Sequence, residues 1–321
     1  MLFFRRQDVK GKEKLLNRVK ILLKLALLLI SASLSFMLFL IVVALFNLPY
    51  IRRAVFGKLP FEIEKKPWSR VKTFQYMKNL WIDVFYPRTE PRGIVLFAHG
   101  GGWISGYRRQ PNNLSWYRFL VSKGFIVAAI DYSRGYRAKI DQLIEELSRA
   151  IVFLDKNRSK LNLADLPISL MGLSAGGHLA LLTAARMYRS VKNVVAYYAP
   201  CDLKDILESS SLFARIALIA TLKRFPLRSS DVLQKYSPIN VVHELMPPVL
   251  LVHGKKDSVV PYQSSVKMYR KLKRLGCRVV LLTHHKADHG FEFVLRDDET
   301  RRILEKTVEF LSEGGQVERI L

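Results

Sequence analysis

The sequence predicts an α/β fold in which helices cover both faces of a mostly parallel, doubly wound sheet. Beyond residue 80, apolar runs of strand length alternate with longer stretches of helical pattern. Several of these runs are apolar without a break, which is typical of strands that are covered on both faces. With 321 residues and 50% hydrophobic content, the chain is long enough to bury a full core.

The elements follow from these runs in order. Strands are expected at residues 80–86, 93–98, 125–131, 167–172, 193–199, 249–253 and 278–283. Helices are expected near residues 138–156, 175–189, 261–275 and 297–313. Parallel strands joined by right-handed crossovers bring their carboxyl ends to one edge of the sheet, where ligands bind in such folds. The motifs described below all follow the ends of predicted strands.

The N-terminal part of the chain predicts a single-pass membrane anchor. Residues 25–46 carry no charge, and 22 residues at ~1.5 Å each span a hydrocarbon core of ~30 Å. A cleaved signal peptide is the alternative, but residues 47–53 offer no small-x-small cleavage site. Eight Lys or Arg residues precede the span and five lie in the next 20 residues. This bias predicts a cytoplasmic N-terminus and a large domain on the periplasmic or lumenal side.

The formal net charge of +25 is high for a chain of this length. The basic residues are dispersed, and no recognition helix, zinc finger or base-stacking motif accompanies them, so no nucleic-acid partner is expected. Adhesion of a basic surface to anionic membrane lipid is one interpretation, and a solvated surface without a partner is the other. The two cysteines, Cys201 and Cys277, do not reveal the compartment.

A serine stands on a predicted tight turn. Residues 172–177 read Gly-Leu-Ser-Ala-Gly-Gly, directly after the predicted strand 167–172 and before a predicted helix. Glycines two positions either side of a serine permit the strained backbone that exposes its hydroxyl. Ser174 is therefore the candidate nucleophile.

A glycine loop follows the predicted strand 93–98. Residues 99–103 read His-Gly-Gly-Gly-Trp, and backbone N–H groups in such a loop can bind the oxyanion that develops during acyl transfer. The expected donors are the N–H groups of Gly101, Gly102 and Ala175, the last at a helix N-terminus. Trp103 and Tyr107 flank the loop and are candidates for the wall of a substrate pocket, with simple packing as the alternative.

Together, the two motifs resemble the α/β-hydrolase fold, and within it the carboxylesterase/lipase group with an HGGGW loop and a GxSAGG elbow. The resemblance covers nearly all of residues 80–315. Hormone-sensitive-lipase-type esterases often carry an acidic residue before the serine, where this chain has Leu173. This departure makes the chain look nearer to the feruloyl-esterase-like, kynurenine-formamidase-like and isoprenylcysteine-methylesterase-like relatives.

The family order of serine, then acid, then histidine identifies the remaining catalytic candidates. Asp257 follows the predicted strand 249–253 and precedes a Pro-started helix, so it matches the position of the acid; Asp202, one strand earlier, is the rival. His289 lies just past the predicted strand 278–283 and matches the base, which would take the proton from Ser174. Asp288, next to the base, is expected to point elsewhere.

Six other histidines compete with His289, and none is expected to act as the base. His178 lies one helical turn beyond Ser174 and is expected to pack. The ring of His99 is expected to hold the glycine loop through hydrogen bonds. The remaining candidates are His284 and His285 at a strand end, His253 satisfied internally, and His243 with no assigned role.

The predicted organisation has four parts. They are a basic cytoplasmic segment (1–24), the signal anchor (25–46), a connector (47–75) and an α/β-hydrolase catalytic domain (76–321) with a lid insertion at about 203–246. The insertion is long for a connection between elements. Its apolar stretch 212–222 is expected either to line a hydrophobic pocket or touch the bilayer, or only to pack on the domain.

These residues predict a serine esterase that acts through an acyl-enzyme on an apolar or lipid-derived ester. No cofactor is needed, and no metal-ligand spacing, phosphate loop or dinucleotide fingerprint occurs in the sequence. An amidase or deacetylase with the same triad, for example formamidase-like, is one alternative. A non-catalytic, membrane-tethered binding protein on a hydrolase scaffold is the other.

Overall fold

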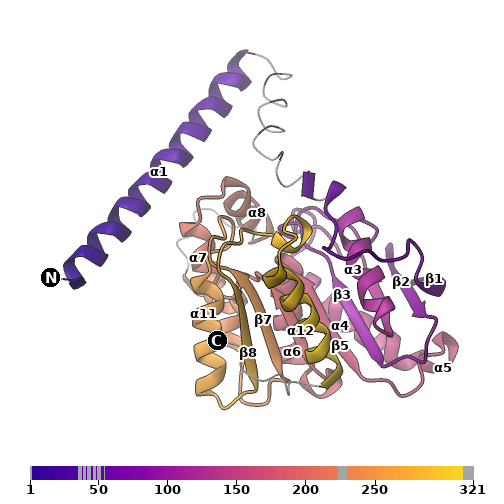
Figure 1. Cartoon of the computed structure of the whole chain (residues 1–321). Coiled ribbons are helices and arrows are strands. Elements are labelled where there is room, and N and C mark those ends of the chain that lie inside the picture. Colours follow the sequence, from indigo (N-terminus) through magenta and orange to yellow (C-terminus); the bar gives the residue numbers. More distant parts are fainter. Residues whose placement is uncertain are drawn as a thin grey trace.

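An eight-stranded sheet forms the centre of the protein (Figure 1). The computed structural model describes residues 2–34, 38, 41, 45, 48, 52–53, 55–222 and 230–313. The strand order is β1-β2-β4-β3-β5-β6-β7-β8; β1 and β2 pair antiparallel with each other, β2 pairs antiparallel with β4, and all later neighbours are parallel. The strands are β1 (Trp68–Met77), β2 (Leu80–Pro87), β3 (Gly93–Ala98), β4 (Phe125–Ile130), β5 (Ile168–Leu173), β6 (Val194–Tyr197), β7 (Val249–Gly254) and β8 (Val279–His284).

Helices cover both faces of this sheet. Helix α1 (Leu2–Leu34) extends away from the sheet. The helices that follow it are α3 (Pro111–Ser122), α4 (Ile140–Lys156), α5 (Arg158–Leu161), α6 (Ala175–Arg186), α7 (Leu203–Glu208), α8 (Leu212–Leu222), α9 (Ser230–Tyr236), α10 (Pro238–Val241), α11 (Gln263–Arg274) and α12 (Asp298–Glu313). Two 3₁₀ helices, η1 (Tyr188–Ser190) and η2 (Phe291–Phe293), complete the set of described helices. The alternation along β3 separates the two faces, because Ile94 and Leu96 lie in one buried cluster while Val95 and Phe97 lie in the other.

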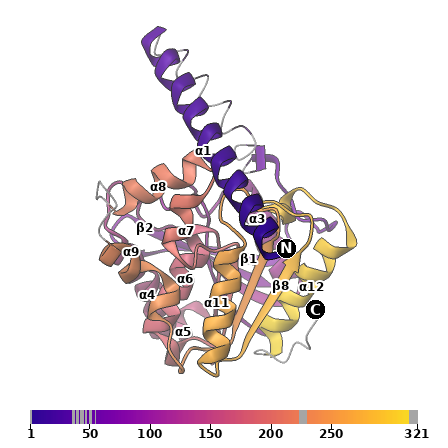
Figure 2. The ribbon, with the colours of Figure 1, turned by 90° about the vertical axis from the view of Figure 1, so that its left-hand side faces the viewer.

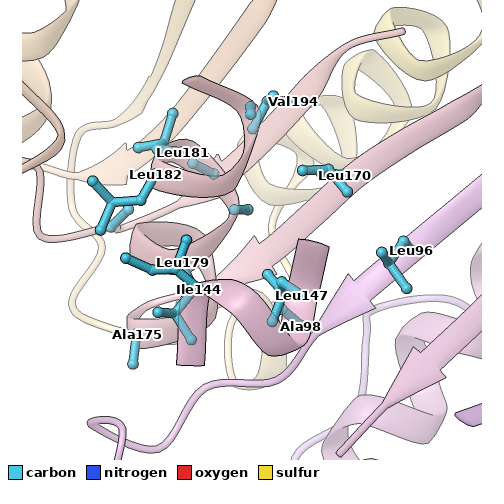
Figure 3. Close-up of a cluster of buried hydrophobic side chains, with 14 of the residues drawn as sticks. Leu96, Ala98, Ile144, Leu147, Leu170, Ala175, Leu179, Leu181, Leu182 and Val194 are labelled. Atoms are coloured by element: carbon cyan, nitrogen blue, oxygen red, sulfur yellow. The ribbon is translucent and has the colours of Figure 1, made fainter. Parts of the chain in front are cut away.

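The first cluster packs α4, α6 and α11 against the sheet, and the second packs α3 and α12 against the opposite face. Figure 3 shows the part of the first cluster around α6, which begins at Ala175. Leu96 of β3 and Leu170 of β5 lie near Leu147 of α4 and Leu179 of α6, and all four side chains are buried. Burial of a leucine side chain contributes ~1.5–3 kcal/mol, so this packing fixes α6 firmly on the sheet.

All seven predicted strands are present, with ends shifted by two residues at most, and the prediction of a mostly parallel α/β sheet is confirmed. The predicted connector 47–75 needs correction, because β1 begins at Trp68. This edge strand has one neighbour and exposes most of its residues, so its sequence lacks an apolar run. Helix α3, which opens with the polar residues Pro111–Asn113, was not predicted either.

Helix α1 is long and extends beyond the domain in both views (Figure 1, Figure 2). Several of its leucines are exposed, including Leu22 and Leu29. Within the described part of the chain, no helix combines the length and the apolar character that a membrane span requires. Of the predicted anchor 25–46, residues 25–34 belong to α1, and most of the others lie outside the described residues.

Candidate active site

The turn between β5 and α6 holds Ser174 in a strained conformation. Its backbone has φ 51° and ψ −116°, a region that non-glycine residues rarely adopt. A Cβ on Gly176 would lie 2.1 Å from the carbonyl oxygen of Ala98, and one on Gly172 would lie 2.2 Å from the backbone of Gly176. The turn therefore packs so closely against the end of β3 that only glycine fits at both positions.

The structure brings Ser174, His289 and Asp257 together from three separate loops. Oγ of Ser174 lies 3.0 Å from Nε2 of His289, and Nδ1 of His289 lies 2.8 Å from Oδ2 of Asp257. These distances form a continuous hydrogen-bonded relay from the hydroxyl to the carboxylate. The loops after β5, β7 and β8 meet at the carboxyl edge of the sheet, as the sequence predicts.

The carboxylate of Asp257 is ionised. Burial opposes ionisation, but electrostatic interaction and hydrogen bonds with the imidazoles of His289 and His253 outweigh it and hold the pKa of Asp257 well below its usual value. Its Oδ1 also accepts hydrogen bonds from the N–H groups of Val259 and Val260, each at 2.8 Å. Since the ionised carboxylate needs a donor, the imidazole proton resides on Nδ1 of His289. Nε2 is then free to accept the hydrogen bond from the Ser174 hydroxyl.

The glycine loop lies beside the serine and lines the same cavity. Gly101 and Gly102 have φ values of 124° and 58°, and both belong to the cavity lining. Among the described residues, no group accepts a hydrogen bond from the N–H of Gly101, Gly102 or Ala175. Backbone donors without an acceptor, next to a nucleophile, can serve an oxyanion.

A cavity of about 510 Å³ opens over Ser174. An apolar part of its lining, called here the apolar side, comes from α7, α8 and the loop after β7: Ile206, Phe213, Ala214, Val259 and Val260. The lining also includes the amides Gln110, Asn112 and Asn113 at the start of α3. The stretch 212–222 thus both lines the cavity and packs on the domain, because Ala217 and Leu218 are buried.

The two aromatic candidates differ in position. Trp103 lines the cavity and is buried, and its indole N–H donates to Nδ1 of His178 at 3.2 Å. Tyr107 is not in the cavity lining and is about half exposed, which corrects its assignment as a pocket residue. Four residues separate it from Gly102, and Gly106, the last of them, lines the cavity while Tyr107 does not.

The other acidic and histidine candidates lie outside the relay. Asp202 accepts a hydrogen bond from the N–H of Lys204 at the start of α7. Burial lowers the pKa of both His99 and His178 to about 4, so both rings are neutral. Each has a local partner, the carbonyl of Gly100 for His99 and the carbonyl of Tyr236 for His178.

His253 hydrogen-bonds Ser265 and Val260 and also lies 3.2 Å from Asp257. The three remaining histidines pair with Asp297, Glu299 and the carbonyl of Ala185: His284, His285 and His243. No group of three or more potential ligands in the described ranges could hold a metal ion.

Three residues near the relay were missed by the sequence analysis. The ring of Tyr198 packs against His289 in a tilted arrangement with ring centroids 4.3 Å apart, and its hydroxyl donates to the buried carboxyl of Glu292 at 2.6 Å. Arg53, far away in sequence, lines the cavity and contacts the His289 loop. Of the three, only Glu292 could have been suspected from the sequence, because it lies three residues after His289. Tyr198 and Arg53 are far from His289 in the sequence, and only the fold brings them into contact with it.

Comparisons with known proteins identify the family of the chain. The BD-FAE family model matches residues 82–272, and a model described as TAP-like protein matches residues 231–314. A probable isoprenylcysteine alpha-carbonyl methylesterase of Oryza sativa subsp. japonica is 28% identical over 66% of this chain and 56% of that protein. Esterase LipC of Mycobacterium tuberculosis is 27% identical over 64% of this chain and 55% of that protein. The chain spans about half the length of the curated relatives it matches.

Solved structures of esterases share the fold of this chain. A truncated carbohydrate esterase from gut microbiota, 20% identical, has a TM-score of 0.69 over 81% of this chain and 100% of that one. An esterase of Pyrobaculum calidifontis, 25% identical, has a TM-score of 0.63 over 77% of this chain and 86% of that one. Since the first family model covers more than half of the sequence, the chain belongs to the BD-FAE family of α/β-hydrolase carboxylesterases.

Proposed function

We propose that this protein hydrolyses carboxylic esters with Ser174 as nucleophile. The observation that carries the proposal is the relay from Ser174 through His289 to an ionised Asp257, open to a cavity. Oγ of Ser174 attacks the ester carbonyl while its proton passes to Nε2 of His289. The tetrahedral oxyanion is bound by the N–H groups of Gly101, Gly102 and Ala175, and each such donor contributes ~3–4 kcal/mol in comparable sites.

Collapse of this intermediate breaks the bond to the leaving alcohol, which takes the proton from Nε2 of His289. A water molecule then gives up its proton to the same nitrogen, attacks the acyl-enzyme and releases the acid and free Ser174. Asp257 stays ionised throughout and stabilises the imidazolium that forms at each step. The cycle uses only groups of this chain and water.

The substrate that fits best is an ester with an apolar acyl or alcohol group. The side of the cavity formed by Ile206, Phe213 and Val260 offers no hydrogen-bonding side chain, so burial of hydrocarbon there provides the binding energy. The relative named as a probable isoprenylcysteine alpha-carbonyl methylesterase supports this substrate class, because an isoprenyl group is an apolar hydrocarbon.

Hydrolysis of a panel of p-nitrophenyl esters by the full chain tests the proposal. Wild-type turnover, loss of turnover in Ser174→Ala, and labelling of Ser174 by a fluorophosphonate support it. Absence of both turnover and labelling contradicts it and favours the non-catalytic binding protein. A matched p-nitroanilide distinguishes the amidase alternative, because an amidase hydrolyses the anilide at a rate comparable with the ester.

We also propose that residues 25–46 anchor the protein in a membrane, with residues 1–24 in the cytoplasm and the catalytic domain on the periplasmic or lumenal side. The uncharged sequence of this segment and the exposed leucines of α1 support the anchor. Retention in membranes after a carbonate wash, with protease protection of the domain in sealed vesicles, is expected. Release into the wash with a mature N-terminus near residue 47 contradicts the anchor and indicates a cleaved signal peptide.

A further inference from the structure

The segment that follows the predicted anchor contacts the loop of the catalytic base. The guanidinium of Arg53 donates through Nη1 to the backbone carbonyl of His289 and pairs through Nη2 with Oδ2 of Asp288 at 3.2 Å. These contacts join residues 235 or more positions apart in the chain. The side chain of Arg53 is 22% exposed, so the contact is partly shielded from solvent and salt.

Asp288 connects Arg53 to both loops of the relay. Its Oδ1 accepts hydrogen bonds from the N–H of His289 at 2.7 Å, from the N–H of Ser258 at 2.8 Å and from the hydroxyl of Ser258 at 2.9 Å. Ser258 directly follows Asp257. One carboxylate therefore ties the loop that carries the acid to the loop that carries the base.

Asp288 is ionised in this arrangement. Burial opposes ionisation, but hydrogen bonds from Ser258, His289 and Arg53 outweigh it and hold the pKa of Asp288 below its usual value. A half-buried carboxylate needs a cation or several donors, and Arg53 supplies the cation. The guanidinium is planar and has several fixed donors, so it can hold the Asp288 carboxylate and the His289 carbonyl at the same time.

Arg53 is itself held by the residues that follow it. The N–H of Gly57 donates to the carbonyl of Arg53 at 2.9 Å, and a Cβ on Gly57 would lie 2.2 Å from that oxygen and 2.8 Å from Phe293. Leu59 is buried in the second core cluster, and Phe61 stacks on Phe119 of α3 with ring centroids 4.7 Å apart. Residues 57–61 are thus packed as part of the domain.

We propose that Arg53 is a positioning residue of the active site, which holds the imidazole of His289 in register with Ser174 and Asp257 by fixing the carbonyl of His289 and the carboxylate of Asp288. The inference rests on the proposed function of the same site. Small displacements of a catalytic group can cost ~10²-fold in rate, so a contact with the backbone of the base has kinetic consequences. The predicted connector then contributes directly to the catalytic geometry.

The test compares Arg53→Ala with Arg52→Ala in the full chain. Arg52 is the exposed neighbour, so its replacement removes the same charge from the same segment without touching the site. Arg53→Ala is expected to lower kcat for a neutral p-nitrophenyl ester by ~10–100-fold, with KM changed less than about threefold. Arg52→Ala should stay within about twofold of wild type in both constants. Arg53→Lys should recover only part of kcat, because one ammonium cannot serve both acceptors with the same geometry.

Hydrogen–deuterium exchange provides a readout that does not depend on turnover. Faster exchange in peptides covering residues 286–293 and 255–260 is expected for Arg53→Ala but not for Arg52→Ala, with the thermal unfolding midpoints of the two variants similar. Unchanged kcat with unchanged exchange overturns the proposal. A rise in KM at constant kcat also overturns it, because Arg53 would then bind the substrate instead of positioning the base. If Arg53→Ala exchanges faster as expected but the wild-type protein turns over no ester, the proposed function fails and the positioning contact stands.

Discussion

Replacement of Gly101 by alanine should damage the glycine loop of residues 99–103 more than the same replacement at Gly100 or Gly102. Gly101 has φ 124°, where a side chain is strained by ~1–3 kcal/mol whatever the space around it. A Cβ at this position would also lie 2.3 Å from the carbonyl oxygen of Ser105 and 2.5 Å from its carbonyl carbon. Both atoms are backbone, so the contact can be relieved only by opening the loop.

That opening would break the turn that shapes the donors. The carbonyl of Gly101 accepts hydrogen bonds from the N–H of Ser105 at 2.9 Å and from the N–H of Ile104 at 3.2 Å. Loss of this turn moves the N–H groups of Gly101 and Gly102 away from the oxyanion. We therefore expect kcat of Gly101→Ala to fall by ~10²–10³-fold, which is the cost of losing one oxyanion donor. KM should change little, because the ground-state substrate does not need these donors.

Gly276→Ala is the matched control. Gly276 has φ 72° in the turn between α11 and β8, and a Cβ there meets no atom within 4 Å. It should lose ~1–2 kcal/mol of stability from backbone strain alone and keep wild-type kcat. The assay is p-nitrophenyl ester hydrolysis, together with thermal unfolding of each variant. A Gly101→Ala enzyme with kcat within threefold of wild type, or a Gly276→Ala enzyme with an equal loss of kcat, would refute the reasoning.

Two further predictions concern side chains around the site. Burial raises the pKa of Glu292 from 4.5 to about 7. Between these two pH values the folded protein keeps this carboxyl protonated and the unfolded protein does not. The free energy of unfolding should therefore fall by up to ~3 kcal/mol as the pH rises from 4.5 to about 7, and then level off. Urea unfolding at pH 5 and pH 8 should therefore differ less for Glu292→Gln than for wild type, and an equal difference contradicts this account. Phe213→Ala enlarges the apolar side of the cavity, so kcat/KM for long acyl chains should rise relative to acetate; an unchanged chain-length profile places the acyl group elsewhere.

Much of the fold was predictable because its central strands are buried on both faces. β3, β4, β5 and β7 are buried along their whole length, so each appears in the sequence as an apolar run between polar turns, broken only by Ser169 in β5 and His253 in β7. The edge strand β1 is different, because it has one neighbour and mostly exposed side chains. Its pairing with β2 depends on the rest of the sheet and leaves little local trace.

Some residues of the site could likewise be predicted from the sequence and others could not. Ser174, Asp257 and His289 each follow a buried strand, so their order in the sequence predicts their meeting at one edge of the sheet. The contact of Arg53 with the His289 loop has no such signal. It depends on how residues 57–61 pack on α3 and η2, and that packing is decided by shape rather than by a period in the sequence.

Backbone strain explains why the motifs need the whole domain. Six non-glycine residues in the described ranges have positive φ, and three of them, Trp103, Ser174 and Tyr198, line the cavity. Each costs ~1–3 kcal/mol and persists only where surrounding contacts fix it. The N–H of Ser174 donates to the carbonyl of Tyr197 at 2.9 Å, that of Tyr198 donates to Val252, and the indole of Trp103 donates to His178. Two of these acceptors belong to β6 and β7, so the sheet itself stabilises the strained residues around the nucleophile, and a Gly-x-Ser-x-Gly sequence without that sheet would relax.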